Sequence, residues 1–222
     1  MKKIAVIYND YISKFGIPRQ SGIVEEESII IFEPEYRVPE SLRGLDEFNY
    51  IWLIWGFSEN EDKEWTPTVR PPRLGGNKRV GVFATRSPFR PNSLGLSSVK
   101  LLEIKDYAEN GKALIVSGAD LMNGTPIYDI KPYLKYADSH VDATDGFALT
   151  ETGEVLKVNF DDDLLKVIPE KIHKPLIEIL SQDPRPQYID DEDRIYGLSY
   201  GGYNIKFSVN DSVLTVVSVT CL

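Results

Sequence analysis

Residues 94–118 read LGLSSVKLLEIKDYAENGKALIVSG, and they contain two strand-like runs, Leu94 to Ile104 and Ala113 to Gly118, joined by a turn-rich segment. Apolar residues in these runs alternate with polar ones or are β-branched, which is typical of strands. Similar runs recur, separated by Gly, Pro and Asn clusters, at Lys3 to Tyr8, Ile23 to Phe32, Tyr50 to Phe57 and Arg79 to Ala84. Helical patterns do not alternate with these runs, which argues against a doubly wound parallel sheet. We therefore expect a mainly β protein whose first domain is an antiparallel β-barrel.

The texture of the chain changes after the polar, turn-rich segment 138–146. A strand-like run at 155–160 is followed by an amphipathic helix expected at about 169–182, with Ile172, Leu176 and Ile179 on one face. Two short strands are expected at 203–209 and 213–219. We predict a barrel domain over residues 1–140 and a smaller α+β domain over residues 141–222.

Composition limits the classes of protein. The single cysteine, Cys221, excludes a disulfide framework within one chain and favours a reducing, cytoplasmic setting. The apolar run that begins at Met1 stops at Asn9, so it is interpreted as a first strand instead of a signal peptide. The longest apolar stretch, Tyr50 to Phe57, is too short to span a membrane.

Charge is segregated along the chain. Residues 65–102 contain no Asp or Glu and carry seven cations, whereas the whole chain has a net charge of −9, so the remainder stands near −16. The cations lie among turn-forming residues, as in 73–77, 85–88 and 90–92, where guanidinium and backbone donors can converge on one ligand. The alternative is a solvated face, but Glu and Lys at helical spacing are missing here. The pattern predicts a polyanion partner or an anionic ligand.

The sequence lacks the motifs of several common classes of enzyme and nucleotide-binding protein. The sequence has no phosphate-binding P-loop, no G-x-G-x-x-G and no G-x-S-x-G elbow. A metal site built from His140, Asp138 and Asp142 has a possible spacing, but hydrated loop acids explain it equally well, and we expect no metal. His173 is interpreted as a core or boundary residue of the predicted helix.

Three polar loops rich in Gly and Pro could converge at one end of the barrel and form a ligand cavity. They are 15–22, the basic segment around Arg86 and Arg90, and 118–134, where acids and amides surround an Asn-Gly turn. That turn could instead simply close a hairpin. From the residues alone, a non-catalytic RNA-binding module and a small-molecule enzyme are equally favoured.

The same segments carry a family resemblance. The motifs IPRQSG, RGLDEF, IWLIWGF, VRPPRLGGNKRVGVFATRSPFRPNSLGLS, DLMNGTPIYDIKPYL and DPRPQY closely resemble the TrmO family, also called TsaA-like or YaeB-like, over nearly the whole chain. The resemblance implies an S-adenosylmethionine-dependent methyltransferase that methylates N6 of threonylcarbamoyladenosine, next to the anticodon of threonine tRNA. It also implies a β-barrel catalytic domain, a smaller C-terminal domain and a homodimer. The alternatives become a small-molecule methyltransferase of the same fold and an RNA-binding module.

Site residues follow from the matching motifs. The resemblance implies S-adenosylmethionine contacts at Pro18, Arg19, Gln20, Ser58, Glu59, Arg86, Leu96, Asp120, Leu121, Met122 and Asn123. We expect Arg86 to bind the donor's carboxylate, because a guanidinium fork suits that group. Candidates to orient or accept the departing proton are Asp120 and Asp129. Candidates for tRNA phosphates are Arg70, Arg73, Lys78, Arg79 and Arg90.

Overall fold

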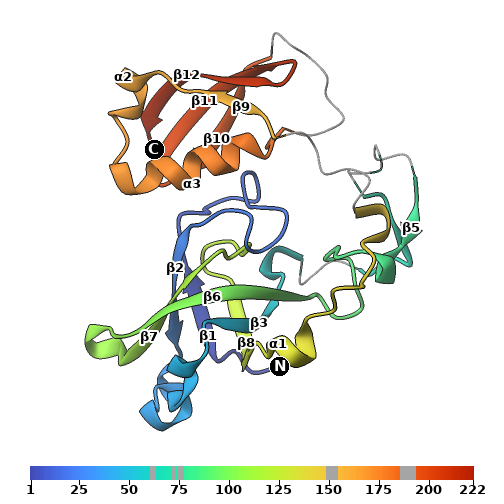
Figure 1. Ribbon diagram of the computed structural model, residues 1–222, viewed down its shortest axis with the longest axis vertical. Helices are drawn as coiled ribbons and strands as arrows, with labels where there is room; N and C mark the ends of the chain where they lie inside the picture. Colours follow the sequence, from blue (N-terminus) through green and yellow to red (C-terminus); the bar gives the residue numbers. More distant parts are fainter. Residues whose placement is uncertain (61–63, 72–73, 75–77, 149–154, 186–193) are drawn as a thin grey trace.

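The computed structural model describes residues 1–222 except 61–63, 72–73, 75–77, 149–154 and 186–193. Its first sheet consists of β1 (Ala5–Tyr8), β2 (Glu27–Phe32), β3 (Tyr50–Gly56), β6 (Leu94–Asp106), β7 (Lys112–Ser117) and β8 (Pro126–Pro132). These strands close into a barrel in the order β1-β2-β7-β6-β3-β8, and every neighbouring pair is antiparallel. The predicted barrel is therefore confirmed, and Figure 1 shows it as the lower body of the molecule.

Side-chain alternation explains why these strands form a barrel. In β3, Ile51, Leu53 and Trp55 are buried, whereas Trp52 and Ile54 between them are only half-buried. The buried set packs with inward residues of the other strands, including Ile7, Ile30 and Leu114, into one core cluster. Because successive strand residues face opposite sides, one apolar face closes around this core while the other meets solvent.

Strand β8 was not predicted, and it completes the barrel. Residues 126–132 read PIYDIKP, whose prolines and charges give no strand signal. The strand forms because it pairs on both sides, with β3 and with β1. The Asn123-Gly124 turn precedes it, but β7 and β8 are not neighbours in the barrel, so this turn does not close a hairpin.

The C-terminal residues form a four-stranded sheet covered by a helix. Its strands are β9 (Lys157–Asn159), β10 (Tyr196–Tyr200), β11 (Tyr203–Asn210) and β12 (Val213–Cys221), in the order β10-β11-β12-β9. Helix α3 (Glu170–Ser181) confirms the amphipathic helix and packs its buried face into the core of this sheet. In Figure 1, α3 lies on the side of the sheet that faces the barrel.

Strand β10 was also missed by sequence reasoning. It pairs with β11 from Tyr196↔Phe207 to Tyr200↔Tyr203, across a turn at Gly201 and Gly202 that both have positive φ. A two-glycine turn between strand residues is a hairpin signal, and it could have revealed this strand. The shorter elements are β4 (Thr68–Val69), β5 (Val80–Gly81), α1 (Lys135–Asp138) and α2 (Asp162–Leu165). The strand expected at 79–84 is thus reduced to β5, after which Val82–Ala84 form a 3-10 turn.

The N-terminal segment between β1 and β2 belongs to the C-terminal core. Tyr11 and Val24 are buried in the cluster formed by α3 and the second sheet, and Phe15, Ile17 and Ile23 pack against it. Gly16 fits this contact because its φ is +94°, and a Cβ built there would lie 2.3 Å from Leu198 Cδ1. The loop that carries Pro18, Arg19 and Gln20 is therefore positioned by the C-terminal half of the protein.

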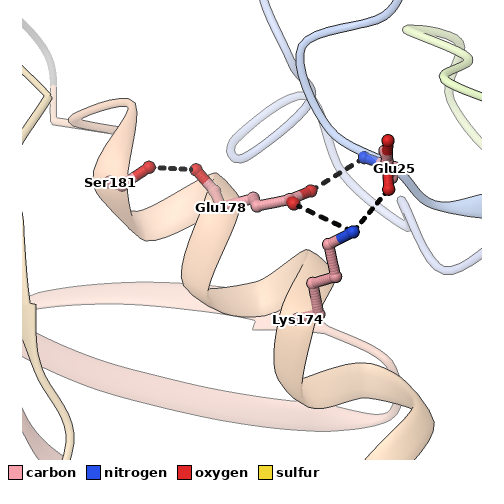
Figure 2. A network of polar contacts seen from close by, with 4 residues as sticks. All are labelled: Glu25, Lys174, Glu178 and Ser181. Carbon is pink, nitrogen blue, oxygen red and sulfur yellow. Dashed lines mark hydrogen bonds and ion pairs between the residues drawn. The ribbon is translucent and has the colours of Figure 1, made fainter.

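Polar contacts join the same two parts, as Figure 2 shows. The Glu25 amide donates to the Glu178 carboxylate at 2.8 Å, and the Lys174 ammonium bridges the carboxylates of Glu25 and Glu178. The Ser181 hydroxyl donates to the Glu178 carbonyl at 2.7 Å. Because exposed ion pairs contribute little free energy, we assign this network a role in orientation and leave most of the stability to the apolar contacts.

Glu26 is buried at this junction, with 3% of its surface exposed. Its Oε1 accepts a hydrogen bond from the Asp10 amide at 2.9 Å, and the rings of Tyr11 and Tyr200 pack 5.7 Å apart beside it. Burial raises the pKa of Glu26 to about 7, while the Asp10 amide acts in the opposite direction. Burial also raises the pKa of both tyrosines. The carboxyl therefore gains a proton in the folded state at pH values where the unfolded chain has lost it.

We predict that Glu26→Gln removes a pH-dependent loss of stability. The pKa of Glu26 in the folded state lies above its ordinary value of 4.5. The stability that protonation of this carboxyl contributes is therefore fully present below pH 4.5 and is lost as the pH rises through about 7. A shift of this size corresponds to about 3 kcal/mol. Urea unfolding should find the two proteins similar at about pH 5 and the variant more stable at about pH 8. Parallel pH dependence in both proteins would refute this assignment.

The predicted division at residue 140 stays a prediction. The barrel strands end at Pro132 and the second sheet begins at Lys157. The junction segment described above crosses between the two cores. Among the described residues, no helix is long and apolar enough to cross a membrane.

Candidate active site

A cavity of about 530 Å³ opens where the N-terminal loop meets one end of the barrel. Five stretches of chain line it: 14–20, the end of β3 with the turn after it, the loop 85–90, the start of β6, and 120–125. Side chains from the last two include Leu96, Asp120 and Met122. The three polar loops singled out in the sequence therefore do meet at one cavity, as expected.

Most of the residues predicted to contact a cofactor lie at this cavity. The lining residues among them are Pro18, Arg19, Gln20, Ser58, Glu59, Arg86, Leu96, Asp120 and Met122. Leu121 is instead fully buried in the barrel core. Asn123 is exposed, and its side-chain oxygen accepts the Asn9 amide at 3.1 Å. Their roles stay predictions, but the geometry gives Leu121 and Asn123 structural tasks next to the cavity.

Arg86 links two of the loops. Its Nη1 donates a hydrogen bond to Oε1 of Gln20. Arg19, from the same loop as Gln20, reaches the Asp183 carbonyl at 3.4 Å. The cavity thus contains guanidinium groups from both sides of the junction, and these can bind an anionic group of a ligand.

Asp120 provides the opposite charge. The Ser97 hydroxyl donates to its Oδ1 at 2.5 Å. Burial raises the pKa of the Asp120 carboxyl, whereas the Ser97 hydrogen bond and the charge of Arg86 lower it. A carboxylate in this position can accept a proton or stabilise a cation.

Asp129, the second candidate acid, lies outside the lining of this cavity. Its carboxylate accepts the Ile130 amide at 2.9 Å and pairs with Lys131 at 3.0 Å. Asp120 and Asp129 are therefore not brought together, and only Asp120 lines the cavity.

The cations of the basic stretch divide between the cavity and the surface. Arg70, Lys78 and Arg79 are exposed, and Arg79 donates to Thr68 Oγ1 at 2.7 Å across the β4–β5 pair. Arg73 lies outside the described residues, as do Gly75 and Gly76.

Arg90 lines the cavity and also supports the adjacent loop. Its Nη1 donates to the carbonyls of Val82 at 3.2 Å and Thr85 at 2.7 Å. Its guanidinium carbon lies 5.6 Å from the centre of the Phe83 ring, which is 73% exposed. This cation therefore holds the turn that presents Phe83 to solvent.

The acidic loop considered for a metal has another task. Oδ2 of Asp138 accepts hydrogen bonds from Trp52 Nε1 at 3.0 Å and from the Leu134 amide at 2.8 Å. Within the described part of the chain, no three His, Cys, Asp or Glu residues gather as metal ligands would.

Sequence reasoning missed several lining residues. Lys14, Trp55, Thr85, Pro88 and Thr125 all contribute to the cavity. Trp55 looks like one more core residue of an apolar strand, and only the strand pairing places it at the barrel mouth. The sequence does not show the order of the strands in the closed barrel, and this order determines which strand ends meet at the cavity.

Comparisons with known proteins place the chain in a family. The tRNA-methyltransferase O N-terminal domain matches residues 6–139, and the TrmO C-terminal domain matches residues 155–221. A tRNA (adenine(37)-N6)-methyltransferase of Escherichia coli K12 is 37% identical over 228 residues, covering 98% of this chain and 96% of that protein. A Pseudomonas aeruginosa protein described as a candidate S-adenosylmethionine-dependent methyltransferase, RcsF, is 37% identical over 88% of this chain and 86% of its own.

Comparison with solved structures supports the same family. A crystal structure of TrmO superposes with a TM-score of 0.78 at 26% identity, covering 98% of this chain and 97% of that one. A crystal structure of TrmO from P. aeruginosa has the same TM-score at 28% identity, covering 99% and 95% of the two chains.

Proposed function

This chain belongs to the TrmO family, and from that premise we propose that it is an S-adenosylmethionine-dependent tRNA (adenine37-N6)-methyltransferase. Its acceptor is N6 of threonylcarbamoyladenosine beside the anticodon of threonine tRNA. The observation that carries the proposal is the cavity at the barrel mouth, where nine of the residues implied by the family motifs converge.

The chemistry of the cavity fits the methyl donor. The donor has a cationic sulfonium and an anionic carboxylate, so its site needs both signs of charge. Asp120 and Glu59 supply carboxylates, and Arg86 supplies a guanidinium for the donor's carboxylate. Leu96 and Met122 add apolar surface for its carbon chain and base. A volume of about 530 Å³ also lies within the range of small-molecule sites.

Bound S-adenosylmethionine supplies a methyl group: a bond from the acceptor nitrogen to this carbon forms as the carbon–sulfur bond breaks, with both electrons staying on sulfur. The protein must orient an exocyclic nitrogen whose lone pair is delocalised, and holding it in line can contribute up to roughly 7–11 kcal/mol. The N6 proton must also leave. Of the two candidate acids, Asp120 and Asp129, only Asp120 lines the cavity, and in this proposal its carboxylate accepts the proton.

The exposed cations form the surface for the tRNA backbone. Arg70, Lys78 and Arg79 are exposed and belong to the same stretch without acids as the loop 85–90 that lines the cavity. The exposed Phe83 and Trp65 offer aromatic faces for unstacked bases of the anticodon loop. The rest of the chain is acidic and repels nucleic acid, so it directs the substrate to this face.

Three further proposals accompany this function. The enzyme acts as a homodimer. It acts in the cytoplasm, where its tRNA substrate is found and where its single cysteine stays reduced. Residues 1–140 form the catalytic domain and residues 141–222 the smaller domain. Each sheet has its own hydrophobic core, which supports this division, although the segment with Tyr11 and Val24 packs into the second core.

Methyl transfer tests the proposal directly. Labelled S-adenosylmethionine is incubated with the protein and two threonine tRNA preparations, one bearing threonylcarbamoyladenosine and one unmodified. We expect label only in the modified tRNA. Cofactor binding without transfer to either tRNA would favour a small-molecule methyltransferase, and tRNA binding without cofactor binding would favour an RNA-binding module.

We predict that Lys78→Ala weakens tRNA binding without changing S-adenosylmethionine binding. Lys78 is exposed and lies outside the cavity lining, so its loss removes one phosphate contact. The slope of log K against log salt should become shallower by about 0.7–0.9. Lys2→Ala, an exposed cation outside the basic stretch, is the matched control. An unchanged salt slope for Lys78→Ala would remove this residue from the proposed tRNA surface.

A further inference from the structure

Three side chains form a directed hydrogen-bond chain that ends at the cavity. Trp55 Nε1 lies 2.9 Å from Ser97 Oγ, and Ser97 Oγ lies 2.5 Å from Asp120 Oδ1. An indole N–H can only donate, so the serine oxygen must accept from it. When the Asp120 carboxyl is ionised, its oxygens can only accept, so the single hydroxyl proton of Ser97 points to Oδ1. The direction of the chain is therefore fixed for the ionised form.

Burial makes this chain rigid. Ser97 is 2% exposed and Trp55 is 7% exposed. A serine hydroxyl normally rotates to suit its surroundings, but here its oxygen accepts from the indole N–H and its proton has the Asp120 carboxylate as acceptor. Buried hydrogen bonds of this kind strengthen one another in a low-dielectric interior.

Gly95 allows Trp55 to reach Ser97. In the β3–β6 pairing, Trp55 lies directly opposite Gly95, and Ser97 follows two residues later on the same face of β6. A Cβ built at Gly95 would lie 2.2 Å from Cε2 and 2.3 Å from Cζ2 of the indole. The indole also packs against the ring of Phe57, and the two ring centres lie 4.4 Å apart. The ring therefore lies across Gly95, and any side chain there would displace it.

We propose that Ser97 and Trp55 are positioning residues which hold the Asp120 carboxylate ionised and in one orientation at the cavity, and that Gly95 is glycine to admit the indole. The catalytic part of this inference rests on the proposed function, because it takes Asp120 as the acceptor of the N6 proton. The hydrogen-bond chain itself is independent of that function.

The surroundings of Asp120 determine what losing Ser97 would do. Burial opposes the ionised carboxylate, and the Ser97 hydroxyl, the Asp120 and Ser21 amides and the Arg86 charge favour it. Removing the hydroxyl leaves burial less opposed, so the pKa of Asp120 rises further. Only the ionised form accepts a proton, so the acidic limb of the kcat/KM profile moves to higher pH in Ser97→Ala, and activity recovers at alkaline pH.

The first experiment needs no ligand. In the ¹⁵N-labelled full chain, the three tryptophans give separate indole N–H resonances, and Trp55→Phe identifies one of them. We expect the chemical shift of the Trp55 indole N–H to change with pH as Asp120 ionises. This pH-dependent change should disappear in Asp120→Asn and in Ser97→Ala. Asp106→Asn, an exposed acid paired with Lys112, is the control that leaves the titration unchanged.

The second experiment uses catalysis. Ser97→Ala should shift the acidic limb of kcat/KM upward, and Ser97→Thr, which keeps the hydroxyl, should restore it. The proposal is overturned if the chemical shift of the Trp55 indole does not change as Asp120 ionises. It is also overturned if the pH profile of kcat/KM for Ser97→Ala superimposes on the native profile. If the native protein transfers no methyl group but the Trp55 resonance titrates with Asp120, the positioning chain stands and the proposed function fails.

Discussion

Asp120→Asn is expected to lower the rate of methyl transfer by about 10²- to 10⁴-fold, the range usual for loss of a positioned acid–base group. Asparagine has the same shape, and its side-chain oxygen can still accept the Ser97 hydrogen bond, so the cavity should keep its geometry. What it cannot do is accept the N6 proton. Single-turnover transfer at saturating S-adenosylmethionine measures this chemical step apart from donor binding.

Two companion variants give the result its meaning. Asp129→Asn discriminates between the two candidate acids, since Asp129 lies outside the cavity lining and is paired with Lys131. Asp106→Asn controls for loss of an exposed acid. A rate that falls for Asp129→Asn and stays native for Asp120→Asn would transfer the role to Asp129 and contradict our assignment.

Arg86→Ala is expected to weaken S-adenosylmethionine binding by about ten- to a hundredfold, because a hydrogen bond to a charged group contributes about 1.5–3 kcal/mol. Arg86 lines the cavity and holds Gln20, so its loss removes a guanidinium and loosens the N-terminal loop. Calorimetric titration with S-adenosylmethionine measures the affinity.

A truncated ligand separates these two effects. Methylthioadenosine keeps the nucleoside and the sulfur but lacks the donor's carboxylate. If Arg86 binds that carboxylate, Arg86→Ala should weaken methylthioadenosine binding much less than S-adenosylmethionine binding, because only the loosening of the loop affects the truncated ligand. Arg70→Ala, a cation of the same stretch outside the cavity lining, should change neither affinity. Equal losses for both ligands in Arg86→Ala would show that the residue acts on the loop alone.

Much of the fold could be predicted because the alternation in strands such as β3 and β6 is strong. Strand β8 could not, since its prolines and charges hide a segment that is stabilised by pairing on both edges. Strand β10 was missed for a related reason: its glycine and serine weaken the local pattern, while pairing with β11 supplies the stability. Local propensity is a weak guide wherever long-range pairing decides the structure.

The candidate site shows the same division. Loop motifs such as 18–20 and 120–123 stand out in the sequence because Pro, Gly and polar residues gather there. Ser97 does not, because a serine within a strand carries no sign that it meets Asp120. Its role depends on the barrel register and on Gly95, which only the folded chain brings together.

The C-terminal half contributes to the site in a way that the sequence did not indicate. Gly16 and Ile17 pack on the C-terminal core, and Arg19 reaches the Asp183 carbonyl. The loop that carries three of the predicted donor contacts is thereby fixed between the two parts of the protein. If Pro18, Arg19 and Gln20 bind the donor as proposed, the smaller unit supports that site by holding their loop.

The most direct measurement locates the transferred methyl group. Threonine tRNA bearing threonylcarbamoyladenosine is treated with the protein and S-adenosylmethionine, digested to nucleosides and analysed by fragmentation mass spectrometry. The account predicts that threonylcarbamoyladenosine becomes one methyl group heavier, with the added carbon on N6, and that Asp120→Asn greatly slows this conversion. A methyl group on another atom or nucleotide, or full conversion by Asp120→Asn, would contradict it.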